Sequence, residues 1–278
     1  MYPFTIDLPS SADALISVSA YRLFGFLAGA YMLSLAIVIV KRSGIRPAQA
    51  ALLVAVVTTA FFIGSRLLYS ILYLPQVIAD PGIITALRIA NFSLHGGLAL
   101  ALFSWWAVAN KLALPFLELT DKLTPHVGIS IAIMRIGCYL NGCCFGKTAS
   151  IPWGVRFPFL SQPHIAQIYT GDIPLFGAPA PVHPTQLYEM AAALIAAATA
   201  WLILKRRKEA GLAAAAFGLL YSLGRFITFF FRSFPAAEGY SNFIRGPVVY
   251  SLAIIVFSLW IFIIYKSEQS EKSLKAGL

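Results

Sequence analysis

Seven long apolar stretches, separated by short polar connections, dominate the pattern of this chain. They lie near residues 15–40, 48–74, 87–110, 123–146, 184–204, 211–232 and 246–265. Each is close to the ~20 residues that an α-helix needs to cross a bilayer. The pattern predicts an all-α polytopic membrane protein with about seven transmembrane helices, forming a single transmembrane domain over residues 1–278.

Lysine and arginine concentrate in alternate connections. The connections 41–47, 111–122 and 205–209 and the C-terminal tail are basic, whereas the other connections carry few basic residues. Basic connections of membrane proteins usually face the cytoplasm. We therefore expect the N-terminus outside and the C-terminus in the cytoplasm. The segment at about 147–183 is rich in proline and glycine, and we expect it to be the main extracytoplasmic feature.

The composition excludes an ordinary soluble domain. The chain is 59% hydrophobic and only 12% charged, against about 25% charged residues in soluble proteins. The net charge of +10 favours contact with an anionic bilayer surface. The basic residues lie at helix ends and form no extended arm, so we expect no nucleic-acid partner. Residues 1–13 contain no basic residue, so a cleaved signal peptide is not expected.

Arginines inside apolar runs include Arg66, Arg88, Arg135 and Arg225. A charge near the bilayer centre costs about 2.5–3.5 kcal/mol and usually faces a protein-lined cavity. The predicted spans supply almost no acidic partners. We therefore expect the balancing charge to arrive with a ligand, such as an anionic lipid headgroup.

Polar residues from several spans are expected at a similar depth. With a rise of ~1.5 Å per residue, the predicted topology places Tyr21, Arg66, His95, Arg135 and Arg225 towards the outer leaflet. The sequence therefore predicts one site, open to that leaflet and built from five helices.

His95 precedes two glycines, Gly96 and Gly97, in the third predicted span. One interpretation is close helix packing by the glycines beside a hydrogen-bonded histidine. The other is a site in which His95 is a general base and the glycines let a lipid approach the backbone.

The segment from Arg135 to Gly146 contains three glycines and Asn141 and predicts a broken backbone at the end of a span. Within a membrane, irregular backbone is tolerated only where it is buried in protein or lines a cavity. Arg135 would there meet a phosphate with its fork of donors. The alternative is a structural arginine bonded to the carbonyl groups that the broken helix leaves free.

The three cysteines of the chain, Cys138, Cys143 and Cys144, fall within this segment. They are interpreted as small buried apolar residues, as a disulfide from Cys138 to Cys143 or Cys144, or as a nucleophilic thiol. A metal site is the weaker interpretation, because the nearest histidines are distant in sequence. We expect neither a metal ion nor a cofactor.

Glu189 and Arg232 each allow two interpretations. The run from His183 to Glu189 resembles an ordinary helix start, with a proline and an early acidic residue. Glu189 is also the only carboxylate inside a predicted span, so it is equally a candidate counter-ion to an arginine. Arg232 lies seven residues after Arg225, hence on the same helix face. The alternative is that its long side chain extends to the membrane–water interface.

These motifs, in this order, resemble the prolipoprotein diacylglyceryl transferase family. The resemblance runs from Tyr21 to the last span. The matching segments are Gly64 to Tyr69, His95-Gly96-Gly97, Arg135-Ile136-Gly137 with Asn141-Gly142 and Gly146, Pro152-Trp153-Gly154, His183 to Glu189, and Arg225-Phe226 with Phe230-Phe231-Arg232.

Enzymes of this family transfer a diacylglyceryl group from phosphatidylglycerol to the lipobox cysteine of a prolipoprotein signal peptide and release glycerol phosphate. The resemblance implies a multi-pass protein of the bacterial cytoplasmic (inner) membrane. It implies catalytic roles for His95, which would assist proton transfer, and for Arg135 and Arg225, which would hold the phosphate. The implied substrate-binding residues are Tyr21, Arg66, Gly96, Gly97, Asn141, Gly146, Glu189 and Arg232.

The chain departs from the family pattern at four places. Cys138-Tyr139 replaces Asn-Phe, Cys143 replaces a glutamate, Phe229 replaces another glutamate, and Pro247 replaces a glutamine. We therefore expect a divergent member whose donor is better defined than its acceptor. The alternatives are a paralogue that uses another acceptor, including one that uses its own cysteine as a relay, and a catalytically silent phospholipid-binding or transport protein.

Overall fold

The computed structural model describes residues 5–9, 15–82, 93–207, 209–234 and 239–276. The chain divides into two compact units, one formed by residues 1–32 and 121–278 and the other by residues 33–120.

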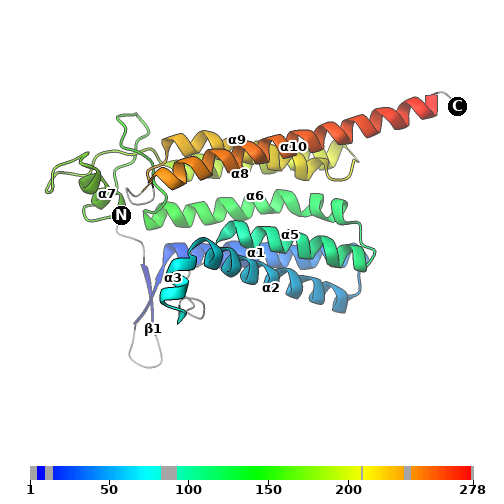
Figure 1. The fold of residues 1–278 in the computed structure, drawn as a ribbon, viewed down its shortest axis with the longest axis horizontal. Helices are drawn as coiled ribbons and strands as arrows, with labels where there is room; N and C mark the ends of the chain where they lie inside the picture. Colours follow the sequence, from blue (N-terminus) through cyan, green and yellow to red (C-terminus); the bar gives the residue numbers. More distant parts are fainter. Residues whose placement is uncertain (1–4, 10–14, 83–92, 208, 235–238, 277–278) are drawn as a thin grey trace. The chain divides into compact units, whose positions relative to one another are not determined.

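The described residues are mainly helical (Figure 1). The elements are β1 (Thr5–Pro9), β2 (Leu15–Ser19), α1 (Ala20–Arg42), α2 (Pro47–Leu72), α3 (Leu74–Ala79), α5 (Leu94–Lys111), α6 (Phe116–Asn141), α7 (Gln162–Thr170), α8 (Thr185–Arg206), α9 (Leu212–Phe231) and α10 (Gly239–Ala276).

Six helices of the described residues are long and apolar enough to cross a membrane. They are α1, α2, α6, α8, α9 and the part of α10 from Gly246 to Ser270. A further helix, α5, coincides with the predicted span 87–110, although the beginning of that span lies outside the described residues. The prediction of an all-α membrane protein with about seven spans is confirmed, while the orientation of the termini stays a prediction.

The first predicted span begins too early. Residues 15–19 form strand β2, which pairs antiparallel with β1 so that Thr5 lies opposite Ser19. From Ile16 to Ser19 the sequence alternates apolar and polar residues, and this period of two is typical of a strand. Helix α1 therefore begins only at Ala20.

The fourth predicted span, 123–146, is displaced. Helix α6 begins seven residues earlier, at Phe116, and ends at Asn141. Its first turns include the buried carboxylate of Asp121, which accepts hydrogen bonds from the backbone amides of Gly211 (2.7 Å) and Ala214 (2.8 Å). Because this carboxylate caps the N-terminus of α9, it can lie within α6. Glu189 is therefore not the only carboxylate within a spanning helix.

In the larger unit, α6, α8 and α9 pack through small residues. A Cβ atom added to Gly128 of α6 would lie 2.6 Å from the Cβ of Ala197 and 2.7 Å from the carbonyl oxygen of Ala193, both on α8. Ala200 of α8 is fully buried in a hydrophobic cluster that also contains Ala197 of α8 and Ala213 of α9. Small residues let helix backbones approach closely in membrane proteins. Close backbones bring the polar side chains of these helices within reach of one another.

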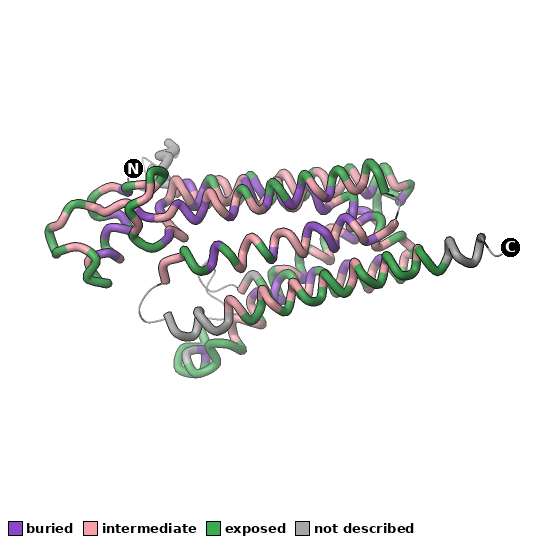
Figure 2. The backbone as a smooth tube through the Cα atoms, turned by 90° about the horizontal axis from the view of Figure 1, so that it is seen from above, coloured by how far each residue is buried: buried purple, intermediate pink, exposed green. Residues whose placement is uncertain are grey.

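The exposed positions of these helices are largely apolar. Along α10, exposed side chains include Leu252, Ile255, Val256 and Leu259. Figure 2 shows α10 largely exposed along its described length, whereas buried positions recur along the helices of the α6–α8–α9 group. Exposed apolar side chains of this kind fit a helix surrounded by lipid.

In the smaller unit, α2 and α5 pack through facing glycines. A Cβ atom on Gly64 would collide with the carbonyl oxygen of Gly96, and one on Gly96 would collide with that of Gly64. The backbone amide of Ser93 donates to the carbonyl of Ser65 at 2.9 Å, which joins the start of α5 to α2.

Candidate active site

A single carboxylate, that of Glu189 on α8, binds three arginines. Arg135 of α6 places Nη2 2.7 Å from Oε2, and Arg232, at the end of α9, places Nη1 3.3 Å from Oε1. Arg225 of α9 contacts Oε1 through its own Nη1. The prediction that Glu189 is a counter-ion is confirmed. Arg225 and Arg232 both reach Oε1, although Arg232 lies in extended backbone just after the end of α9, so a shared helix face does not account for this contact.

This cluster is buried and electrically unbalanced. The side chain of Glu189 is 2% exposed, and those of Arg135, Arg225 and Arg232 are 15%, 16% and 21% exposed. Three guanidinium groups against one carboxylate leave an excess of two positive charges. Buried charges are normally paired, so the cluster is suited to bind a further anion.

Two tyrosines lie beside the arginines. The hydroxyl oxygen of Tyr250, on α10, accepts hydrogen bonds from Nε (3.1 Å) and Nη2 (2.6 Å) of Arg225. Tyr221, one turn before Arg225 on α9, lies within electrostatic range of both Arg225 and Arg135.

The backbone turns sharply after α6, as the glycines of this segment predict. Gly142 and Cys144 have φ angles of 69° and 58°. The start of α8 holds this turn: Thr185 Oγ1 donates to the carbonyl of Cys144 and Gln186 Nε2 to that of Cys143, both at 2.7 Å. The irregular backbone is therefore bonded to protein, as burial requires.

Gly146 lies where three chain segments meet. Its amide donates to the carbonyl of His183 at 2.9 Å, and the amide of Lys147 donates to that of Phe231 at 2.8 Å. A Cβ atom on Gly146 would lie 2.6 Å from both of these carbonyl oxygens. Gly146 thus ties the end of α9, which carries Arg232, to the start of α8, which carries Glu189.

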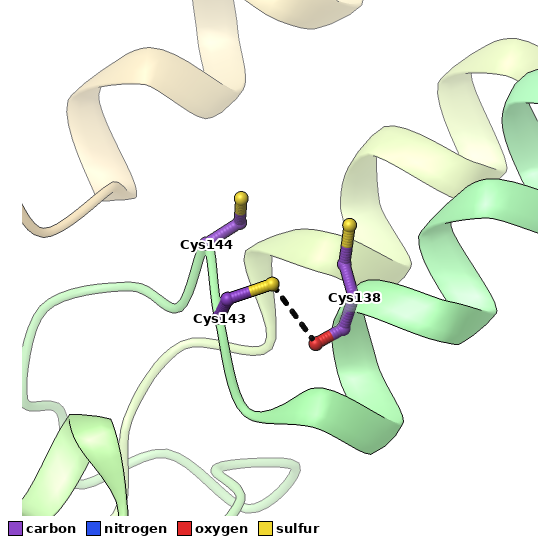
Figure 3. A group of neighbouring side chains, drawn as sticks. All are labelled: Cys138, Cys143 and Cys144. Atoms are coloured by element: carbon purple, nitrogen blue, oxygen red, sulfur yellow. Dashed lines mark hydrogen bonds between the residues drawn. The ribbon is translucent and has the colours of Figure 1, made fainter. Parts of the chain in front are cut away.

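The three cysteines are free thiols and lie together at this turn (Figure 3). The thiol of Cys143 donates to the carbonyl of Cys138 at 3.6 Å, and Cys138 Sγ accepts a hydrogen bond from Arg135 Nη1 at 3.8 Å. Hydrogen bonds from Cys138 and Cys143, with the charges of Arg232 and Arg135 nearby, lower the pKa of Cys144. The cysteines are therefore connected to the arginine cluster and form no disulfide in this structure.

The segment 147–183 is folded rather than spanning. Its only helix of the described residues is the nine-residue α7. The buried His164 accepts at Nδ1 from the amide of Leu160 and donates from Nε2 to the carbonyl of Gly177, at 3.1 and 2.9 Å. Gln167 bonds both the amide and the carbonyl of Ala180. These hydrogen bonds fold the segment onto itself. Its extracytoplasmic location stays a prediction.

The family is decided by comparison with known proteins. A family model described as prolipoprotein diacylglyceryl transferase matches residues 11–264. The chain belongs to the prolipoprotein diacylglyceryl transferase family. The resemblance inferred from the ordered motifs is therefore confirmed.

Bacterial relatives named phosphatidylglycerol–prolipoprotein diacylglyceryl transferase match most of the chain. A protein of Solidesulfovibrio magneticus is 31% identical over 226 residues, which is 79% of this chain and 78% of the relative. One of Nitratidesulfovibrio vulgaris is 30% identical over 223 residues, 80% of this chain and 77% of the relative. One of Azotobacter vinelandii is 34% identical over 182 residues, which is 65% of this chain and 63% of the relative.

The remaining predicted site residues of this family member are distributed over both units. In the larger unit, Tyr21 of α1 is half-buried and within electrostatic range of Cys138 and Arg135, and Asn141 ends α6 and hydrogen bonds with Cys143. Tyr21 therefore lies near Arg135, and the roles of Tyr21 and Asn141 in substrate binding stay predictions.

In the smaller unit, His95 is exposed on the first turn of α5, and Arg66 is half-buried on α2. Gly96 and Gly97 are buried against α2, so helix packing accounts for both glycines. Their role in substrate binding, and the roles of His95 and Arg66, stay predictions. Arg88 lies outside the described residues.

Tyr221 and Tyr250 were not among the site residues predicted from the sequence. Tyr221 precedes Arg225 by four residues, the spacing at which helical side chains lie on one face, so it could have been found. Tyr250 contacts Arg225 from a different helix, and no local spacing indicates such a contact.

Proposed function

We propose that this protein transfers a diacylglyceryl group from phosphatidylglycerol to the thiol of a lipobox cysteine in a prolipoprotein signal peptide and releases glycerol phosphate. The observation that carries the proposal is the buried cluster of Arg135, Arg225 and Arg232 around Glu189. The reaction takes place at the outer leaflet of the bacterial cytoplasmic membrane, with the N-terminus outside.

The charge of the cluster matches the charge change of this reaction. Phosphatidylglycerol carries a phosphodiester of charge −1, whereas the leaving glycerol phosphate is a monoester whose second pKa is about 6, so its charge approaches −2. The excess of two positive charges in the cluster is therefore balanced best as the leaving group departs. Interactions that strengthen in this way lower the barrier and not merely the binding free energy.

The bonds that change are one C–S and one C–O bond. The sulfur of the acceptor cysteine attacks the glyceryl carbon next to the phosphate, a thioether forms, and the C–O bond breaks with its electron pair going to the phosphate oxygen. The thiol proton passes to His95, whose imidazole is exposed on the first turn of α5 and acts as the general base. The arginines thus bind the phosphate, and His95 deprotonates the acceptor thiol.

A covalent relay through a cysteine of this chain does not fit the chemistry. The first step would make a thioether on the protein, and the second would have to break that thioether with an alkyl thiolate as the leaving group. A thiolate is a far poorer leaving group than a phosphate stabilised by arginines. Direct transfer to the acceptor is therefore the mechanism that we propose.

The test uses the purified protein in vesicles of phosphatidylglycerol with a synthetic lipobox peptide, followed by mass spectrometry. We expect a peptide that has gained one diacylglyceryl group in thioether linkage, with an equal amount of glycerol phosphate. The same peptide with serine in place of cysteine, and vesicles of phosphatidylcholine, are the controls. A folded protein that binds phosphatidylglycerol but forms no thioether would instead be a silent binding protein.

A further inference from the structure

Three side chains of the site have no part in the proposed reaction: the thiols of Cys138, Cys143 and Cys144. They come from the end of α6 and the turn that follows it (Figure 3). Their three Sγ atoms all lie within 4.8 Å of one another, and Cys138 is buried while the other two are half-buried. No other cysteine exists in the chain, so every thiol of the protein is gathered in this one place.

We infer that Cys138, Cys143 and Cys144 form a three-thiolate binding site for a thiophilic metal ion, Zn²⁺ or Cu⁺. Zinc–sulfur bonds of about 2.3 Å place the sulfurs of a tetrahedral site about 3.8 Å apart. The observed separations, within 4.8 Å, reach this value with small side-chain rotations. Soft thiolate ligands select soft ions of this kind.

The backbone holds the thiols in this arrangement. Neighbouring residues in an extended chain point to opposite sides, yet Cys143 and Cys144 both present sulfur to Cys138. The left-handed conformation of Cys144, with φ 58°, makes this possible. Such conformations are costly for residues other than glycine and cluster at functional sites. The hydrogen bonds from Thr185 and Gln186 fix the turn.

The charges around the thiols favour a metal–thiolate complex. Binding of Zn²⁺ by three thiols releases three protons and leaves a complex of charge −1, and binding of Cu⁺ leaves one of −2. Arg135 already donates a hydrogen bond to Cys138 Sγ at 3.8 Å, and hydrogen-bond donors of this kind stabilise and orient metal ligands. Three protein ligands leave a fourth position of zinc for water.

This inference goes beyond the proposed transfer reaction and does not depend on it. The sequence alone favoured no metal, because it offers no histidine near the cysteines. In the structure, the turn after α6 brings Cys143 and Cys144 to Cys138, so that three sulfurs meet without a histidine.

The experiment titrates the reduced, metal-free protein in detergent with Zn²⁺, and separately with Cu⁺, against a chromogenic chelator. We expect one ion per chain. Replacing any one cysteine by serine lowers the affinity by about 100-fold or more, because one of three thiolate ligands is lost. The matched control Ser150→Ala, at an exposed position of the loop that follows, leaves it unchanged.

A second measurement avoids the risk that a cysteine variant fails to fold. In the wild-type protein we expect the half-buried thiols of Cys143 and Cys144 to react with a disulfide reagent when the protein is metal-free, and to be protected when it is metal-loaded. Metal binding that leaves these thiols reactive would overturn the inference. Serine variants that bind the metal as tightly as the wild type would also overturn it. Neither readout requires transferase activity, so failure of one proposal is distinguishable from failure of the other.

Discussion

Arg135 Nη2 and Glu189 Oε2 lie 2.7 Å apart and join helix α6 to helix α8. The same carboxylate also binds Arg225 and Arg232 of α9. One acidic residue therefore organises three basic residues from two other elements. It reduces their mutual repulsion without neutralising them, and this is the property that an anion-binding site requires.

Replacing Glu189 by glutamine is expected to destabilise the protein strongly. The change leaves three buried guanidinium groups without their counter-ion, and removing one partner of a buried ion pair costs about 3–5 kcal/mol. Thermal unfolding in detergent measures the effect. The control Glu209→Gln affects a pair with the half-exposed Arg207 at 3.9 Å, and surface pairs contribute only about 0–1 kcal/mol. Equal unfolding temperatures of the two variants would contradict the role of Glu189.

Gly146→Ala is expected to destabilise the contact between the ends of α8 and α9. The added Cβ atom would lie 2.6 Å from the carbonyl oxygens of His183 and Phe231, which are backbone atoms and cannot move aside easily. Gly29→Ala is the matched control, because a Cβ atom there meets nothing within 4 Å and alanine favours a helix by about 1 kcal/mol over glycine. Unfolding temperatures that fall for Gly146→Ala and hold or rise for Gly29→Ala are the expected result.

The spanning helices could be predicted from sequence because hydrophobic length reports the membrane directly. The boundaries at Ala20 and Phe116 could not, since a strand pairing and the capping of α9 by Asp121 decide them. The arginines and Glu189 were found because charges are rare within spans. Their mutual pairing was only one of two interpretations, because the contact joins helices that are distant in sequence.

His95→Gln is expected to reduce turnover without weakening donor binding. General acid–base catalysis contributes about 100- to 10,000-fold, and the exposed side chain of His95 makes a small contribution to stability. Initial rates with the lipobox peptide and the dissociation constant for phosphatidylglycerol separate the two effects. His126→Gln, which alters a histidine bonded to Tyr31 at 3.0 Å, is expected to keep its turnover. A His95 variant with normal turnover would remove this residue from the mechanism.

The stability of the turn at His183 is expected to fall on acidification. Partial burial, and then the charge of Lys147, lower the pKa of His183 below its ordinary value. The unfolded chain then takes up the proton first, so stability decreases as the pH falls through about 6.5 and levels off below the folded-state pKa. Comparing unfolding temperatures at about pH 7.5 and about pH 5.5, we expect a smaller change in His183→Gln than in the wild type. An equal change would exclude this contribution.

Binding of phosphatidylglycerol to variants of the three arginines tests the central claim most directly. Native mass spectrometry of the detergent-solubilised protein is the measurement, with Arg207→Ala as the control because Arg207 is 55% exposed and pairs with Glu209 and Glu268 rather than with Glu189. The account predicts that the wild type and the control retain one phosphatidylglycerol, while Arg135→Ala, Arg225→Ala and Arg232→Ala lose it. Retention of the lipid by all three folded variants would contradict the account.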